Sequence, residues 1–148
     1  MIAFYGADVT VPLKQRKLVR KWLEALALQR GYRIESLGYV FCSDEYLLQM
    51  NKEYLNHDYF TDVITFPLVD AGNVVVAECY VSVDRIKENA IENGVTFVSE
   101  LLRVMAHGLL HLTGEDDKDP KAETQMRSAE ENALQLWLFH VEQSKHNK

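Results

Sequence analysis

The sequence predicts a single α/β (α+β) domain spanning residues 1–148, in which a small mixed β-sheet is covered by helices. Its 148 residues are the length of one ordinary domain. Strand-like and helix-like segments follow one another in the order β-α-β-α-β-β-α-α-α, and this order favours one mixed sheet with helices packed on it. A hydrophobic content of 47%, a charged content of 26% and only 3 prolines exclude disordered and low-complexity classes.

A short strand and an amphipathic helix are predicted near the N-terminus. Ile2–Tyr5 is apolar and aromatic, as is typical of a strand. From Lys14 to about Arg30, apolar side chains recur every three or four residues and form one helical stripe: Leu18, Trp22 and Leu26, flanked by Val19 and Leu23. Gly31 supplies the end of this helix.

The middle of the chain is predicted to form three strands and one helix. Tyr32–Cys42 is rich in aromatic and β-branched residues, and Gly38 within it indicates a bulge or a close backbone approach. Ser43 then caps a helix whose first turn carries two carboxylates. Val63–Phe66 and Val74–Val81 are short β-branched runs joined by a loop of hairpin composition.

Three helices are predicted after this hairpin. The first is capped by Asp84 and ends at Gly94. The second, Phe97–Leu112, is strongly apolar. The third begins at the cap Asp119 with a first-turn proline and runs to about residue 143.

The same composition indicates a compartment. No apolar run approaches the roughly 18 residues of a membrane helix, so we expect no membrane partner. The first basic residue is Lys14, so a secretory signal pattern is lacking. Cys42 and Cys79 lie in apolar stretches, which is typical of reduced core cysteines. These features predict a soluble cytoplasmic protein.

Charge is distributed unevenly along the chain. Residues 1–33 carry seven basic and two acidic side chains, a net charge of +5, whereas residues 34–148 carry nine basic and twenty acidic ones, a net charge of −11. A cationic helix on an acidic body is a candidate contact for a polyanion, and the alternative is an ordinary solvated helix face. The basic residues concerned are Lys14, Arg16, Lys17, Arg20 and Lys21.

One short segment, residues 107–117, carries the strongest chemical signal. His107 and His111 are four residues apart on a helix and therefore lie one turn apart on the same face, within reach of one ion. Gly114 permits a turn that brings back a third ligand. Three protein ligands with one open position are typical of catalytic zinc, which lowers the pKa of bound water to roughly 7. The candidates for the third ligand are Glu115, Asp116 and Asp117.

This spacing also matches the outline of the metallopeptidase motif H-E-x-x-H-x-x-G-x-x-H. The glutamate after the first histidine is the general base in those enzymes, and Gly108 occupies that position here. A metallopeptidase is therefore the less favoured alternative.

Two blocks of the chain form a more specific pattern. The first is His107-Gly108-x-Leu110-His111-Leu112-x-Gly114-x-Asp116, and the second is Asn51-x-x-Tyr54 … Asp58-x-x-Thr61-Asp62-Val63-Ile64-Thr65-Phe66. They resemble the motifs H-G-x-L-H-L-x-G-Y-D-H and N-x-x-Y-R-x-x-D-x-x-T-D-V-L-S-F of the YbeY family of bacterial metal-dependent endoribonucleases. The strand around Glu78-Cys79-Tyr80-Val81-Ser82 is similar to that family's G-D-I-x-I-S piece, with Ala77 in place of glycine.

The resemblance implies an α/β domain that binds one zinc per chain and cleaves single-stranded RNA. It further implies roles in maturing the 3′ end of small-subunit ribosomal RNA and in ribosome quality control, with RNA and the ribosome or its subunits as partners. Carried over by position, the zinc ligands are His107, His111 and Asp117. The general base is left open, and the candidate catalytic residues beside a metal-bound water are Asp62, His57 and Arg103.

The chain departs from the family pattern at two positions. Asp117 stands where the family has a third histidine; a carboxylate is an acceptable zinc ligand, but it should leave bound water less acidic and let harder divalent ions compete. Leu55 stands where the motif has an arginine, a residue that would stabilise charge on a scissile phosphate. Either His57 or Arg103 substitutes for it, or the nuclease is weaker. A ribosome-associated binding protein with weak or lost nuclease activity is therefore the main alternative.

Other side chains near these motifs have two possible roles each. Asp62 either orients a ligand imidazole through its second ring nitrogen or caps a turn. Arg103 is expected to pair with Glu100, which lies too far along the helix to be a ligand. Tyr54, Phe60 and Phe66 are candidates for stacking on bases, although core packing is favoured for Phe66.

Overall fold

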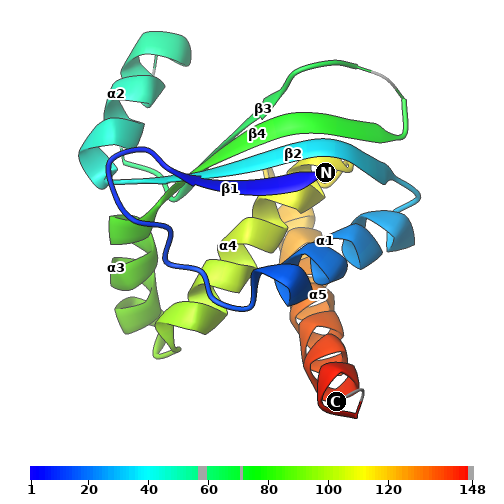
Figure 1. Cartoon of the computed structure of the whole chain (residues 1–148). Helices are drawn as coiled ribbons and strands as arrows, with labels where there is room; N and C mark the ends of the chain where they lie inside the picture. Colours follow the sequence, from blue (N-terminus) through cyan, green and yellow to red (C-terminus); the bar gives the residue numbers. More distant parts are fainter. Residues whose placement is uncertain (57–59, 71, 147–148) are drawn as a thin grey trace.

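The computed structural model describes residues 1–56, 60–70 and 72–146 (Figure 1). The predicted element order is confirmed, with boundaries that differ by a few residues. The elements are β1 (Ile2–Gly6), α1 (Arg16–Gln29), β2 (Arg33–Cys42), α2 (Asp44–Tyr54), β3 (Val63–Pro67), β4 (Val74–Ser82), α3 (Val83–Asn93), α4 (Phe97–Leu112) and α5 (Pro120–His146).

The four strands form one mixed sheet in the order β1-β2-β4-β3. β1 runs parallel to β2 and β2 parallel to β4, whereas β3 and β4 form the predicted antiparallel hairpin. The bulge predicted at Gly38 is wrong, because the register shift lies between Ile34 and Ser36. Gly38 pairs in register with Ala3 and Glu78, and a Cβ there would make only ordinary contacts.

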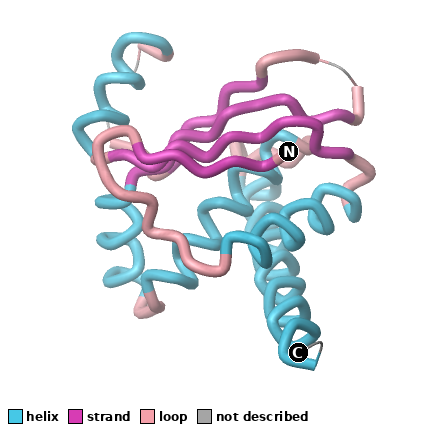
Figure 2. Tube along the Cα trace, in the orientation of Figure 1, coloured by secondary structure: helices cyan, strands magenta, loops and turns pink. Residues whose placement is uncertain are grey.

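The helices lie on the sheet unequally. Four of them, α1, α3, α4 and α5, lie on one face, and α2 lies on the other face at one end of the sheet (Figures 1 and 2). The main core fills the space between the sheet and the four helices. Trp22 on α1 donates a hydrogen bond to the carbonyl of Ala133 on α5 (2.8 Å), and its ring meets Trp137 edge-on. These contacts hold the two outer helices together.

Helix α4 crosses the middle of the core, as its apolar sequence predicts. The Tyr39 hydroxyl on β2 donates to the carbonyl of Met105 on α4 (2.8 Å). Gly108 faces the β3–β4 hairpin, and a Cβ there would lie 3.2 Å from the sulfur of Cys79 and 3.5 Å from a methyl of Thr65. The absence of a side chain lets α4 approach the sheet closely and places the neighbouring His107 beside β3.

Most helix ends follow the local signals, with one correction. The Ser43 hydroxyl caps α2 by accepting from the backbone N–H of Tyr46. The cap of α3 is Ser82, which accepts from the N–H of Arg85, and not Asp84. Asp84 lies in the first turn instead, where its carboxylate accepts from the N–H of Asp44. Both residues are good caps, and only the tertiary contact with α2 decides between them.

Among the described residues, no single helix is both long and apolar enough to cross a bilayer. By length and composition, α3 and α4 taken together would be, and they meet at a bend of 116°.

Candidate metal centre

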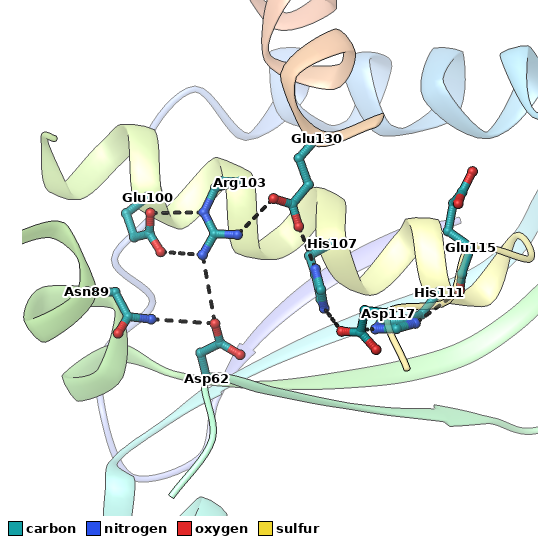
Figure 3. A network of polar contacts seen from close by, with 9 residues as sticks. All are labelled: Asp62, Asn89, Glu100, Arg103, His107, His111, Glu115, Asp117 and Glu130. Atoms are coloured by element: carbon teal, nitrogen blue, oxygen red, sulfur yellow. Dashed lines mark hydrogen bonds and ion pairs between the residues drawn. The ribbon is translucent and has the colours of Figure 1, made fainter. Parts of the chain in front are cut away.

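Three side chains converge at the C-terminal end of α4. His107 and His111 project from successive turns of that helix, and the following loop folds back to bring Asp117 between them (Figure 3). Gly114 has φ of 105°, a conformation in which glycine is favoured, and Glu115 N–H bonds back to the carbonyl of Leu110. The loop chemistry predicted from the sequence therefore places the third ligand.

The spacing of these atoms suits a metal better than a hydrogen bond. An Asp117 oxygen lies 3.6 Å from Nε2 of His107 and 3.4 Å from Nε2 of His111, and all three ligand atoms fall within 4.8 Å of one another. These separations exceed a hydrogen bond. Ligands of a tetrahedral zinc at about 2.0–2.2 Å lie about 3.4 Å apart. The donor set thus fits a divalent ion held by two imidazoles and one carboxylate.

The other two candidates for the third ligand have different partners. Glu115 forms an ion pair with Arg30 (2.7 Å), and its backbone carbonyl, not its carboxylate, contacts His111. Asp116 accepts a hydrogen bond from the N–H of Lys118. The structure therefore selects Asp117 from the three neighbouring acidic residues.

Each histidine is held through its second ring nitrogen. Nδ1 of His107 lies 2.5 Å from a carboxylate oxygen of Glu130 on α5, and Nδ1 of His111 lies 3.1 Å from the carbonyl of Glu115. Both partners leave Nε2 directed at Asp117, and metal-bound histidines are typically held in this way through the ring nitrogen that does not bind the metal. The imidazole-orienting role considered for Asp62 is wrong, because Glu130 takes that position at His107.

Glu130 was not predicted from the sequence. It lies 23 residues after His107, on a separate helix, and no metal motif includes it. One signal was present: Glu130 falls on the apolar stripe of α5 formed by Met126, Ala133 and Trp137, where a carboxylate needs a buried partner.

A chain of ion pairs extends from the histidine into the core (Figure 3). Arg103 bonds both oxygens of Glu100 (3.0 and 2.5 Å) and the second oxygen of Glu130 (2.9 Å). The predicted pairing of Arg103 with Glu100 is therefore confirmed. A carboxylate oxygen of Asp62 lies 3.9 Å from the same guanidinium and 3.5 Å from the side-chain amide of Asn89. The Arg103 guanidinium is thus bound to carboxylates of the protein itself.

This network changes the acidity of its members. Burial opposes protonation of His107, but the hydrogen bond to Glu130 and the surrounding negative charges outweigh it and raise the pKa of the imidazole. Burial would raise the pKa of Glu130, yet its bonds to His107 and Arg103 lower it. Burial raises the pKa of Asp62, and the nearby positive charges offset this only in part.

The three candidate ligands open onto a cavity of about 620 Å³. Its walls come from the end of α2, from β3 and the residues before it, and from α4 and the loop that follows: Asn51, Leu55, Thr61, Asp62, Val63, Ile64, Thr65, His107, His111, Asp117 and Lys118. Leu55 and Asp62, two positions of the second family motif, therefore lie in the wall of this cavity, beside the candidate ligands. His57 lies outside the described residues.

The remaining sequence candidates lie away from this cavity. Arg20 donates to the carbonyl of Ile2 (2.9 Å) and lies over the ring of Phe4, so it is a structural residue of the α1–β1 contact. The other four basic candidates are exposed: Lys14, Arg16, Lys17 and Lys21. Tyr54 and Phe66 meet edge-on outside the cavity lining, and Phe60 lies beneath the guanidinium of Arg85.

Comparisons with known proteins agree with this geometry. Residues 2–137 match the family model described as Endoribonuclease YbeY. The chain is 46% identical over 138 residues to a Cytophaga hutchinsonii protein of that name, covering 93% of this chain and 96% of the relative. It is 42% identical over 133 residues to the Porphyromonas gingivalis protein, covering 90% and 87%.

A solved structure shares the fold. The solution structure of a Thermotoga maritima protein matches with a TM-score of 0.66 and 27% identity, covering 100% of this chain and 96% of that one. The family model and the curated relatives extend over most of the chain and include both the cavity and its candidate ligands. The chain belongs to the endoribonuclease YbeY family.

Proposed function

We propose that this protein is a zinc-dependent endoribonuclease that cleaves single-stranded RNA during ribosomal RNA processing. The observation that carries the proposal is a set of three candidate ligand atoms within 4.8 Å of one another at the wall of an open cavity. Both histidines are held in place by contacts of their Nδ1 atoms. A zinc ion in such a set supplies a Lewis acid and lowers the pKa of water. His107, His111 and Asp117 would hold it.

The other polar residues of the cavity have roles that follow from their contacts. Glu130 holds the proton of His107 at Nδ1, so that Nε2 is free to act as a ligand. Asp62 lines the cavity, and burial raises the pKa of its carboxyl group, as is common for groups that exchange protons in active sites. We assign Asp62 as the candidate general base or acid of the cleavage step.

The central experiment compares metal content and RNA cleavage in matched variants. Wild-type protein purified without added metal should carry about one zinc per chain. Asp117→Ala should lose most of that zinc and its cleavage of a single-stranded oligonucleotide, whereas the neighbouring Asp116→Ala should keep both. Asp62→Asn should keep the zinc and lose cleavage. Zinc retained by Asp117→Ala would contradict the ligand assignment.

A binding protein with little nuclease activity is the second candidate, because Leu55 places an apolar side chain in the cavity wall where the family motif has arginine. Turnover decides between the two: an enzyme cleaves many RNA molecules per chain. Zinc-loaded protein that binds RNA without turnover would favour the binding role. The metallopeptidase alternative is disfavoured, because Gly108, at the position of the general base in those enzymes, faces the sheet and not the candidate metal ligands.

The biological role is proposed from the family. We place the protein in the cytoplasm, acting at the 3′ end of small-subunit ribosomal RNA and in ribosome quality control. Sequencing of that 3′ end in a bacterium whose own gene is replaced by wild type or by Asp117→Ala would test the maturation role. Unprocessed ends are expected with the variant, and normal ends would contradict it.

The exposed basic residues of α1 are the proposed RNA contact. Lys17 and Lys21 lie four residues apart on one exposed face. Reversing both charges to glutamate should weaken RNA binding and lower its salt dependence by about two counterions, without changing metal content. The matched control is Lys87→Glu with Lys121→Glu. If the control weakens RNA binding equally, α1 is not the RNA contact and its basic residues form an ordinary solvated helix face.

A further inference from the structure

A second hollow lies on the face of the sheet opposite the main core. It is a groove of about 690 Å³ between α2 and the outer surface of β3 and β4. Tyr46, Met50 and Tyr54 form the wall from α2, because their spacing places them on one side of the helix. Phe66 and Tyr80 form the floor. We call this hollow the outer groove.

Aromatic rings dominate the outer groove and remain accessible. Phe66 meets Tyr54 and Tyr80 edge-on, with centroids 6.4 and 5.7 Å apart. Tyr54 is 67% exposed and Leu68, at the rim, is 56% exposed. Large apolar side chains exposed together in a hollow are typical of a binding surface.

The outer groove is separate from the candidate metal centre. Alternate residues of β3 point to opposite faces of the sheet, so Thr65 contacts α4 while Phe66 faces the groove. In the described part of the chain, no residue that lines the groove also lines the metal cavity. An occupant of the groove would therefore leave the ligands His107, His111 and Asp117 free.

The charged side chains that line the groove are negative. Among the described residues, four of the lining residues are acidic and none is basic: Asp8, Glu45, Glu53 and Glu78. Asp8 accepts hydrogen bonds from the backbone and hydroxyl of Ser43 (2.9 and 2.5 Å). Within the described part of the chain, the three glutamates have no ion-pair partner. Phosphate would be repelled here and a cation attracted.

Aromatic faces beside unpaired carboxylates are suited to arginine and lysine side chains. A guanidinium stacks on an aromatic ring and bonds a carboxylate at the same time, while its aliphatic stem covers apolar side chains such as Met50 and Leu68. We propose that the outer groove docks a basic, arginine-rich segment of a partner protein. RNA is disfavoured as the occupant, because its backbone would face the four carboxylates.

Binding of a fluorescein-labelled nonapeptide of alternating arginine and glycine tests the proposal. Fluorescence anisotropy should show salt-sensitive binding to the wild type. Glu45→Lys with Glu53→Lys should weaken it about tenfold or more, because two favourable contacts become repulsive. Tyr54→Ala should weaken it several-fold, and Tyr54→Phe should restore most of the affinity because it keeps the ring.

The control changes the net charge equally at another place. Glu123→Lys with Glu131→Lys alters two exposed carboxylates on α5 and should leave peptide affinity within about twofold. An equal loss in this control would show that the peptide senses net charge only, and would overturn the proposal. Circular dichroism melting of each variant confirms folding, and Glu45→Gln with Glu53→Gln provides a milder pair that should weaken binding less.

Oligouridine binding tests the other class of occupant. The outer groove variants should leave the affinity for a single-stranded oligouridine undiminished, since we place RNA elsewhere. If Tyr54→Ala weakens oligouridine binding and leaves peptide binding unchanged, the groove holds bases and the proposal is wrong. RNA cleavage by the Glu45→Gln with Glu53→Gln variant should stay at the wild-type rate, because both residues lie outside the metal cavity.

Discussion

Glu130 shows how one buried carboxylate links the candidate metal centre to the core. It is 5% exposed and holds His107 with one oxygen and Arg103 with the other. Arg103 in turn binds Glu100, which is 2% exposed. Charges buried this deeply are stable only when each has its partner. The orientation of His107 therefore depends on a network that begins on another helix.

We expect Glu130→Gln to lower zinc affinity about 10–100-fold, because the amide is a weaker partner for His107. Glu130→Ala should in addition lower the free energy of unfolding by about 3–5 kcal/mol, since Arg103 would lose a buried partner. Chelator competition measures the first effect and urea denaturation the second. Glu131→Gln, at the exposed neighbouring position, is the control. Unchanged zinc affinity in Glu130→Gln would contradict the positioning role.

Leu55 is the second informative residue. It lines the metal cavity at the position of the family's arginine, and its side chain is 39% exposed. Leu55→Arg should raise the rate of RNA cleavage about tenfold, because a guanidinium there would stabilise charge developing on phosphate oxygens. Leu138→Arg adds the same charge at an exposed position on α5 and should have no such effect. A folded Leu55→Arg protein with an unchanged rate would show that the phosphate does not reach this wall.

At the scale of single elements, the position of α4 depends on Gly108. The helix carries both candidate histidine ligands, and its close approach to β4 leaves no free space for a larger side chain. A glycine inside a helix costs about 1 kcal/mol relative to alanine, so close packing must compensate for it here.

Substitutions at Gly108 should separate these two effects. In Gly108→Ala, the gain in helix propensity and the 3.2 Å contact with Cys79 should nearly cancel in the free energy of unfolding. Gly108→Val should lower that free energy by about 1–3 kcal/mol through overpacking. Urea denaturation gives both values. A Gly108→Val protein as stable as wild type would mean that α4 moves away from the sheet at little cost.

The hairpin and the helix ends show what local patterns predict well. The loop composition after Phe66 predicted an antiparallel pair, and the structure confirms it. The prediction that Asp84 caps α3 was wrong. Ser82 and Asp84 are both good caps, and the contact of Asp84 with α2 comes from a residue far away in the sequence. Local sequence predicts that a helix begins, while neighbouring elements decide at which residue.

At the scale of the whole molecule, the two cysteines report on the integrity of the core. Cys42 and Cys79 are both free and fully buried, on opposite sides of the sheet. Burial raises the pKa of each thiol to about 12, and for Cys42 the negative charges of Asp8, Asp44 and Asp84 add to the effect. Neither thiol is therefore a nucleophile in the folded protein.

We expect the native protein to resist alkylation by iodoacetamide at pH 8, and to react at both cysteines once it is unfolded in urea. The sign follows from the pKa: at pH 8 a thiol with a pKa of about 12 is almost entirely protonated. Mass spectrometry counts the modified cysteines. Rapid modification of the folded protein at pH 8 would contradict the burial of both sheet faces.

The distribution of charge also acts on the whole molecule. Four acidic residues line the outer groove, while four exposed basic residues, Lys14, Arg16, Lys17 and Lys21, lie close together at the start of α1. The net charge of −6 describes neither surface. The molecule thus presents separate regions of opposite charge, and each attracts a different class of partner.

The sequence by itself determined the features that arise from neighbours along the chain. Helical spacing placed His107 and His111 on one face, Gly114 allowed the loop to return, and β-branched runs formed the strands. The structure confirmed the predicted position of Asp117 beside the histidines, but only the tertiary structure decided that Glu130 orients His107 and that α2 forms a groove with β3 and β4. The reason is physical: periodicity and turns are short-range, whereas a carboxylate's choice of partner depends on which distant elements pack together and exclude water.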